Sequence, residues 1–217
     1  MRLVAHADAF AWLAENPAAP FSSVVTSLPD VSEVPAMGFE GWRTWFIEAA
    51  YRVIAWLPPS GVAIFYQSDV VHRGTWIDKS YLVQRALERT EATLAWHAIV
   101  CRKPPGTIAR GRATYTHMLC VRASAITGAI TEPANRGPDV LDAGAMPWSK
   151  AMGVEACRAA CAYLKRDTQT RTVVDPFCGR GTVLAVAEEL GFEAIGVDIS
   201  AKRCRAARKL SIADLAH

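Results

Sequence analysis

The sequence predicts an α/β protein built on a doubly wound, mostly parallel sheet. The first observation behind this is alternation: short apolar segments typical of buried strands take turns with longer segments in which apolar residues recur every three or four positions. Such alternation is typical of a parallel sheet covered by helices on both faces. The second observation is a pair of long strands with no helix between them, which predicts one antiparallel hairpin at a sheet edge.

The elements follow from these patterns in order along the chain. Seven strands are expected, at 2–6, 22–27, 62–68, 93–103, 113–123, 172–177 and 192–200. Helices are expected at 8–16, 41–57, 79–92, 149–166, 181–191 and 201–211. The segment 123–147 is rich in Gly, Pro and Asn, which predicts a loop.

Composition narrows the function classes. The chain has 217 residues, of which 51% are hydrophobic and 21% charged, enough for a full core in one domain and too apolar for disorder. Its net charge of +3 permits a polyanionic partner without demanding one. The six cysteines show no C-x-x-C pair and no zinc spacing, so we expect no metal and a reduced, cytoplasmic setting. No signal peptide and no apolar run of membrane-spanning length is found, so no membrane is expected as a partner.

The stretch VVDPFCGRGT at 173–182 is the most informative. An apolar strand ends in Asp175, a loop with Gly179 and Gly181 follows, and a helix begins at Thr182. A second strand ends in Asp198, where a carboxylate can bind the hydroxyls of a ribose. The loop is neither G-x-G-x-x-G nor a P-loop, and the charge of Asp175 favours a ligand with a positive amino group over a phosphate. The alternative is a strand–turn–helix junction whose glycines only fit the turn.

DPFCGRGT resembles the S-adenosylmethionine-binding motif DPF-x-G-x-G-T of amino-methyltransferases that act on adenine N6 or cytosine N4. The resemblance implies a Rossmann-like methyltransferase sheet and S-adenosyl-L-methionine as cofactor. Only two strands lie at or after the glycine loop, so the others come from upstream and the chain is circularly permuted. This matches the subgroup in which the catalytic motif precedes the cofactor motif.

The rest of the chain also resembles that subgroup. Residues 2–30 match its opening pattern, 93–123 its late hairpin and, more loosely, 146–164 the helix before the cofactor strand. We therefore expect a single methyltransferase domain over 1–217, with an acceptor half at 1–122, a loop at 123–147 and a cofactor-binding half at 148–217.

The resemblance also implies a set of cofactor contacts. Asp8 matches the acid that contacts the adenine, although it could instead cap a helix. Lys150 would lie near the methionine end, although it could be a solvated cation. The residues expected to bind the cofactor are Asp8, Ser149, Lys150, Asp175, Phe177, Cys178, Gly179, Gly181, Thr182, Asp198 and Ile199.

TSLPD at 26–30 occupies the place of the catalytic motif S/N/D-P-P-Y/F/W. The resemblance implies that Ser27 Oγ and the Leu28 carbonyl accept hydrogen bonds from the target amine, while Pro29 stiffens the turn. Leu28 replaces the first proline, and Asp30 replaces the aromatic residue that stacks on an extruded base. Asp30 has three interpretations: it binds the target's edge or accepts its proton, it caps the following turn, or the pocket is degenerate.

The leading functional hypothesis is methylation of an exocyclic amine of a nucleobase. No separate target-recognition module is visible, which favours RNA over DNA. Two groups of basic residues either contact phosphates or form solvated faces; they are Arg102, Lys103, Arg110 and Arg112, and Lys202, Arg203, Arg205, Arg208 and Lys209. The alternatives are a methyltransferase of the same fold that acts on a hydroxyl, a protein or a small molecule with Asp30 as base, and a non-catalytic cofactor-binding partner subunit. A homodimer is compatible with the sequence. No role is assigned to His72, His97 or His117.

Overall fold

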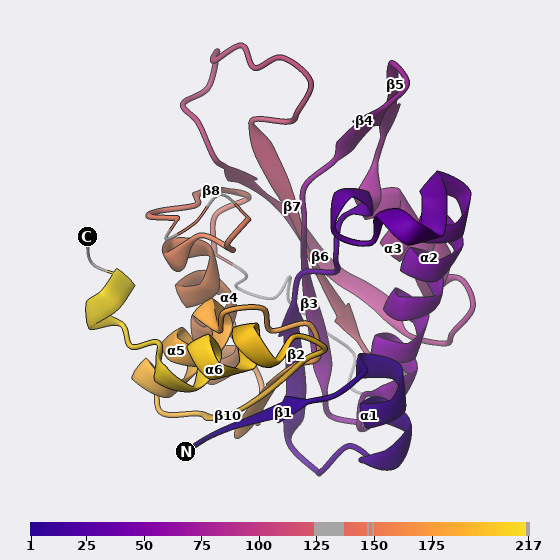
Figure 1. The fold of residues 1–217 in the computed structure, drawn as a ribbon. Coiled ribbons are helices and arrows are strands. Elements are labelled where there is room, and N and C mark those ends of the chain that lie inside the picture. The colour runs from indigo at the N-terminus through magenta and orange to yellow at the C-terminus, as the bar shows by residue number, and fades with distance from the viewer. Residues whose placement is uncertain (124–136, 147, 149, 216–217) are drawn as a thin grey trace.

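An eight-stranded sheet forms the centre of the protein (Figure 1). The computed structural model describes residues 1–123, 137–146, 148 and 150–215. The sheet order is β1-β10-β9-β2-β3-β7-β6-β8. Its strands are β1 (Arg2–His6), β2 (Ser22–Thr26), β3 (Val62–Gln67), β6 (Thr93–Cys101), β7 (Tyr115–Arg122), β8 (Val140–Asp142), β9 (Thr172–Asp175) and β10 (Glu193–Asp198).

The strands from β1 to β3 in this order run parallel to one another, whereas β7 runs antiparallel to both β3 and β6. The late strands β9 and β10 lie between the early strands β1 and β2. This order is the one expected of a permuted chain, because the C-terminal strands fill the middle of a sheet that the N-terminal residues begin. The predicted fold class is confirmed.

Helices cover both faces of the sheet (Figure 1). One face carries α1 (Ala9–Glu15), α2 (Gly38–Trp56) and α3 (Lys79–Leu87), and the other carries α4 (Val154–Asp167), α5 (Thr182–Glu189) and α6 (Ala201–Lys209). Each face has its own hydrophobic cluster, with Trp42 and Phe46 fully buried in the first, and Leu164 and Leu184 fully buried in the second. Three short 3₁₀ helices complete the described chain: η1 (Val31–Glu33), η2 (Pro35–Met37) and η3 (Ala213–Leu215).

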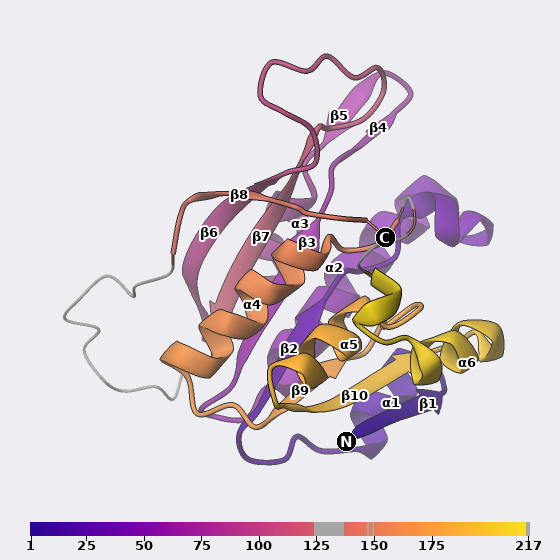
Figure 2. The ribbon, with the colours of Figure 1, turned by 90° about the vertical axis from the view of Figure 1, so that its left-hand side faces the viewer.

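The structure adds strands that the sequence did not predict. The three-residue strand β8 lies in the segment predicted as a loop, and it pairs with β6, so the β6–β7 hairpin is not the outermost part of the sheet. A separate hairpin joins β4 (Val70–His72) to β5 (Thr75–Ile77). Its turn residues, Arg73 and Gly74, both have positive φ, as a two-residue hairpin turn requires. Figure 2 shows this hairpin projecting beside the loop that joins β6 to β7.

The helix expected from residue 149 begins instead at Val154, with Gly153 as its N-cap. A Cβ on Gly153 would lie 2.0 Å from the carbonyl oxygen of Ala143, so the backbone just after β8 passes too close for a side chain. The expected helix start at Ser149 lies outside the described residues. None of the helices in the described ranges is long and apolar enough to cross a membrane.

The fold brings the two sequence motifs together. Strands β2, β9 and β10 are parallel neighbours, so their carboxyl ends lie at one edge of the sheet. The TSLPD turn follows β2, the glycine loop follows β9, and Asp198 ends β10.

Two glycine substitutions compare a tightly packed position with a loosely packed one. Gly153→Ala places a methyl group against the Ala143 backbone, and we expect it to lower the free energy of unfolding by about 1–3 kcal/mol. Gly41→Ala is the matched control within α2, where the nearest atom to an added Cβ is 3.5 Å away, and we expect it to stabilise the protein by about 0.5–1 kcal/mol. Urea denaturation measures both; equal effects of the two changes would contradict the close approach at Gly153.

Candidate functional site

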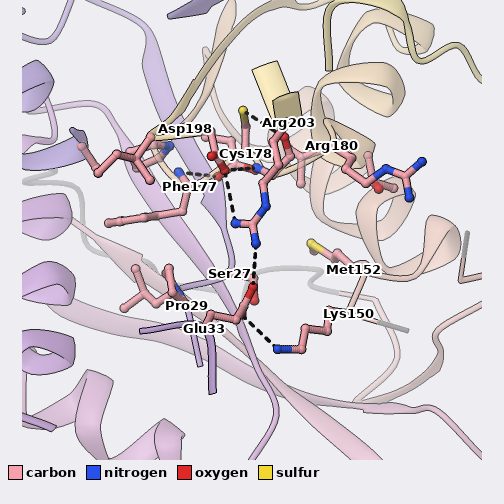
Figure 3. Close-up of a pocket in the computed structure, with 18 of the residues that line it drawn as sticks. Ser27, Pro29, Glu33, Lys150, Met152, Phe177, Cys178, Arg180, Asp198 and Arg203 are labelled. Carbon is pink, nitrogen blue, oxygen red and sulfur yellow. Dashed lines mark hydrogen bonds and ion pairs between the residues drawn. The ribbon is translucent and has the colours of Figure 1, made fainter. Parts of the chain in front are cut away.

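A cavity of about 400 Å³ opens at the carboxyl ends of β2, β9 and β10 (Figure 3). Its volume is in the range of small-molecule sites. Residues from both ends of the chain line it. The lining includes twelve of the residues predicted from the sequence: Asp8, Ser27, Leu28, Pro29, Lys150, Asp175, Phe177, Cys178, Gly179, Thr182, Asp198 and Ile199.

Asp175 lies at the floor of this cavity and is only 3% exposed. Its Oδ1 accepts hydrogen bonds from Thr26 Oγ1 at 2.6 Å and from the Phe177 N–H at 3.1 Å. Burial raises the pKa of Asp175 to about 7, although these two hydrogen bonds oppose the shift. Its carboxylate has no cationic partner within the described ranges, so a ligand that brings a positive charge to the cavity floor would stabilise the ionised form.

The two glycines of the loop have different roles. Gly179 has a φ of 55°, nothing lies within 4 Å of an added Cβ, and its N–H donates to Asp198 Oδ2 at 3.1 Å. A ligand in the cavity can therefore approach the backbone of Gly179 closely. Gly181 has a φ of 90°, and its Cβ would lie 2.9 Å from Ala207 of α6. The sequence predicted that Gly181 contacts the cofactor, but the structure places it outside the cavity lining, where it allows α5 to begin against α6.

Asp198 joins the glycine loop to α6. Its Oδ1 accepts the Ser200 N–H at 2.7 Å, and its Oδ2 lies 3.7 Å from Nη1 of Arg203. Nη2 of the same arginine lies 3.5 Å from Glu33 Oε1, so Arg203 reaches across the cavity from α6 to η1 (Figure 3). The sequence placed Arg203 only in a basic cluster. Its position five residues after Asp198, in the first turn of α6, was the available signal.

An apolar wall faces these polar groups. The ring of Phe177 meets Trp45 edge-on, with centroids 5.8 Å apart. Ile199, directly after Asp198, is 71% exposed and lines the same cavity. An exposed aliphatic side chain beside an aromatic ring suits a flat, partly apolar ligand such as adenine.

Asp8 and Lys150, both predicted to bind the cofactor, line the cavity and also make contacts within the protein. Asp8 is the N-cap of α1, with Oδ1 accepting from the N–H groups of Phe10 and Ala11, and it also lines the cavity. Lys150 lies at the cavity mouth, where Nζ donates to Ser32 Oγ at 3.0 Å and lies 4.0 Å from Glu33. Ser149 lies outside the described residues.

The TSLPD turn forms the wall opposite the glycine loop. Leu28 is buried, and the Pro29 carbonyl accepts a hydrogen bond from Trp42 Nε1 at 3.1 Å, which fixes the turn against α2. Asp30 is the N-cap of η1 and forms a capping box with Glu33. The capping interpretation of Asp30 is therefore the one that the structure shows.

A second cavity, of about 330 Å³, adjoins the first. Both cavities are lined by Ser27, Leu28, Glu33, Lys150 and Ala151. Asp30 lines only this second cavity, together with Asp69 and Lys79. Burial raises the pKa of Asp69, but hydrogen bonds from His117, the Lys79 N–H and Trp76 outweigh it and hold the pKa below its usual value.

The histidines to which the sequence assigned no role have partners in the fold. His97 Nε2 lies 3.0 Å from His117 Nδ1, and His117 Nε2 lies 3.2 Å from Asp69 Oδ2. His72 stacks on Phe39, with ring centroids 4.0 Å apart. No fixed sequence spacing joins these residues, because they meet across neighbouring strands and loops.

Comparisons with known proteins agree with this geometry. Residues 165–209 match the family model of N6- and N4-methyltransferases described as DNA methylase, which confirms the predicted family over this segment. No curated protein matches the chain.

Solved structures match over nearly the whole chain. A "putative DNA modification methylase" from Thermus thermophilus, complexed with S-adenosyl-L-methionine, has a TM-score of 0.73 and 21% identity over 99% of this chain and 96% of its own. The M1.HpyAVI complex with the same cofactor has a TM-score of 0.62 and 18% identity, covering 96% and 99%. The cytosine-N4-specific PvuII DNA methyltransferase has a TM-score of 0.73 and 16% identity, covering 97% and 86%. At these identities the likeness establishes the fold.

The raised pKa of Asp175 predicts a pH-dependent cost in stability. At pH values between the pKa of Asp175 in the unfolded chain and about 7, the unfolded chain has lost the Asp175 proton while the folded protein keeps it. The free energy of unfolding therefore falls as the pH rises through this range. Asp175→Asn removes this pH-dependent contribution to the free energy of unfolding. We expect the stability of the variant relative to the wild type to increase by about 2–4 kcal/mol between about pH 4 and about pH 8.

Denaturant unfolding at the two pH values measures this difference, and comparing the two values cancels any pH-independent cost of the amide. Glu91→Gln, at an exposed position, is the control. A relative stability of Asp175→Asn that is the same at both pH values would contradict the buried, protonated carboxyl.

Proposed function

We propose that this protein transfers a methyl group from S-adenosyl-L-methionine to an exocyclic amine of a nucleobase. One observation carries the proposal: the Ser27–Pro29 turn and the glycine loop after Asp175 face each other across one cavity. The family match over residues 165–209 supports the reaction class. The fold shared with structures solved with S-adenosyl-L-methionine supports the cofactor.

The residues of the first cavity fit this cofactor. The buried carboxylate of Asp175 lacks a cationic partner in the described chain, and the open backbone at Gly179 leaves room for one, so the amino group of the methionine part would lie near both. Asp198, at the tip of β10, would accept hydrogen bonds from the ribose hydroxyls. Phe177 and Ile199 offer the apolar surface for the adenine. Arg203 lies across the cavity between Asp198 and Glu33, so we expect it to move or to contact the cofactor when the cavity fills.

The cofactor supplies an electrophilic methyl group on a sulfonium, and the turn after β2 prepares the nucleophile. An exocyclic amine is a weak nucleophile because its lone pair is delocalised into the ring. Ser27 and Leu28 line both cavities. Ser27 Oγ and the Leu28 carbonyl would accept hydrogen bonds from the two N–H groups of the amine, which favours a tetrahedral amine. The amine then attacks the methyl carbon as the carbon–sulfur bond breaks, and it loses one proton to water. Such positioning accounts for most of the rate gain in a direct displacement.

Asp30 as a general base for a hydroxyl or protein acceptor has less support. Its carboxylate caps η1 and lies off the cofactor cavity. No feature of the described chain favours a non-catalytic partner subunit.

Nucleic acid fits the surroundings of the second cavity. Gly111 and Arg112 of the β6–β7 loop line it, and this loop also carries Arg102, Lys103 and Arg110. Cations beside the acceptor cavity can contact phosphates. The sequence favoured RNA because no separate recognition module is visible. However, this chain covers 96% of the Thermus thermophilus protein, which is described as a putative DNA modification methylase. We therefore propose nucleic acid as the partner and test RNA and DNA side by side; the cytoplasmic location stays a prediction.

Calorimetry and methyl transfer test the proposal together. We expect the protein to bind S-adenosyl-L-methionine and to transfer label from it to total RNA or DNA. Ser27→Ala removes one acceptor from the amine, and we expect transfer to fall by roughly 10- to 100-fold with unchanged cofactor affinity.

Ser60→Ala, next to the start of β3 and away from the first two cavities, is the matched control. Absence of cofactor binding would refute the proposed reaction. Full activity of Ser27→Ala would refute the role of the turn.

A further inference from the structure

Two segments project from the same end of the sheet and together carry basic but no acidic residues. They are the β4–β5 hairpin, residues 70–77, and the loop that joins β6 to β7, residues 102–114; we call them the basic arm (Figures 1 and 2). An isolated bridge between Val70 and Arg112 joins them. The whole chain has 24 basic and 21 acidic residues, whereas the basic arm has no Asp or Glu and five cations: Arg73, Arg102, Lys103, Arg110 and Arg112. This composition favours an anionic partner.

Most cations of the basic arm are open to solvent. Residues 103–112 are exposed, and so is Arg73 in the turn of the hairpin. Within the described ranges, the side chains of Lys103, Arg110 and Arg112 make no hydrogen bond or ion pair. Their donors are therefore free to bind the oxygens of a phosphate.

The acids that border the basic arm are engaged within the fold. Asp69 is buried and accepts hydrogen bonds from its neighbours, and Asp78 caps α3. Asp30 and Glu33, which line the second cavity, form the capping box of η1. Among the described residues, none of these four acids forms an ion pair with an exposed cation of the basic arm.

The hairpin also presents an aromatic ring to solvent. Trp76 is 49% exposed, and its cross-strand partner Val71 is 37% exposed. Residues paired across a hairpin share one face, so the two side chains form one exposed apolar surface. Trp76 Nε1 donates to Asp69 Oδ2 at 2.9 Å, and Asp69 is only 4% exposed. A buried carboxylate thus fixes the orientation of an exposed ring.

The other face of the hairpin attaches it to the body of the protein. Val70 and Ile77 are paired across the two strands and pack against the hydrophobic cluster on the α2 side of the sheet. His72 stacks on Phe39 of α2, with ring centroids 4.0 Å apart. The exposed ring of Trp76 therefore stands on a fixed support, which reduces the entropy lost when a ligand binds to it.

The basic arm is continuous with the proposed acceptor site. Val71, Gly111 and Arg112 line the second cavity. Trp76 lines neither the first nor the second cavity. Its ring is therefore placed to contact a nucleotide beside the target rather than the target itself.

We propose that the basic arm binds the nucleic-acid strand beside the target nucleotide, with Lys103, Arg110 and Arg112 on its phosphates and Trp76 stacked on an unpaired neighbouring base. Aromatic rings among cations are the usual means of holding an unpaired strand, because every base has a face that can stack. The inference rests on the proposed function, since it states how the same site holds its nucleic acid.

Binding of short fluorescent strands, measured by anisotropy without cofactor, tests the basic arm. The strands are oligothymidine, oligouridine and an abasic deoxyribose-phosphate strand of the same length. We expect the wild type to bind a base-bearing strand at least about 5-fold more tightly than the abasic one, because only bases stack. Binding of only one base-bearing strand would identify the nucleic acid as DNA or RNA and would still support the proposal. Equal affinity for the abasic strand would overturn it.

Two substitutions of Trp76 separate stacking from support of the fold. Trp76→Phe and Trp76→Leu both lose the N–H that bonds Asp69, but only the first keeps an aromatic ring. We expect Trp76→Leu to weaken binding of the base-bearing strand by roughly 5- to 100-fold and to leave binding of the abasic strand unchanged. Trp76→Phe should keep most of the affinity. Equal losses in the two variants would overturn the stacking role.

A pair of double variants tests the phosphate contacts. Replacing Lys103 and Arg110 by Gln should lower the salt dependence of binding, the slope of log K against log salt, by about 1–1.5. Replacing Lys202 and Lys209 by Gln is the matched control, because it removes the same charge from exposed positions of α6. Equal effects of the two pairs would overturn the location of the contacts.

The outcomes separate this inference from the proposed function. A protein that binds strands as expected but neither binds S-adenosyl-L-methionine nor transfers its methyl group contradicts the proposed function alone. A protein that methylates nucleic acid, but whose Trp76→Leu and Lys103/Arg110 variants bind strands like the wild type, overturns this inference alone. Wild-type affinity of each variant for S-adenosylhomocysteine shows that its fold is kept.

Discussion

The hydrogen bond from Thr26 to Asp175 is the contact on which the site depends. It joins residues 149 positions apart in the chain, at 2.6 Å and with both side chains buried. Thr26 ends the strand before the TSLPD turn, and Asp175 ends the strand before the glycine loop. Because β2 and β9 are parallel neighbours, the bond holds the ends of both strands in one register. The acceptor wall and the cofactor loop therefore face each other across a single cavity.

The site concentrates buried charge that the fold does not neutralise. Asp175 and Lys79 are both almost fully buried, and burial shifts the pKa of each toward its neutral form. Such groups reduce the stability of the free protein, and they are characteristic of binding sites that a charged or polar ligand completes. Glu33 connects the two cavities, because it closes the capping box with Asp30 and lies near Arg203 and Lys150.

The sequence predicted the parts that local pattern determines. The buried strands are uninterrupted apolar runs, and the glycine loop with Asp198 carries a dense motif, so these elements could be predicted from the sequence. Capping of the following turn was one of three open interpretations of Asp30, and the structure adds that Glu33, three residues later, completes a capping box. The strand β8 was missed because three residues show no periodicity, and the β4–β5 turn because Arg–Gly is a weak turn signal. Gly181, Arg203 and Lys79 owe their positions to tertiary contacts with α6, η1 and α2, which no spacing encodes.

The most direct test of the account is a crystal structure with S-adenosylhomocysteine bound. We predict the homocysteine amino group at Asp175, the ribose at Asp198, and the sulfur pointing to Ser27 and Leu28, where the second cavity begins. A cofactor bound away from the cavity between β2, β9 and β10, or a sulfur that faces away from Ser27, would contradict the account.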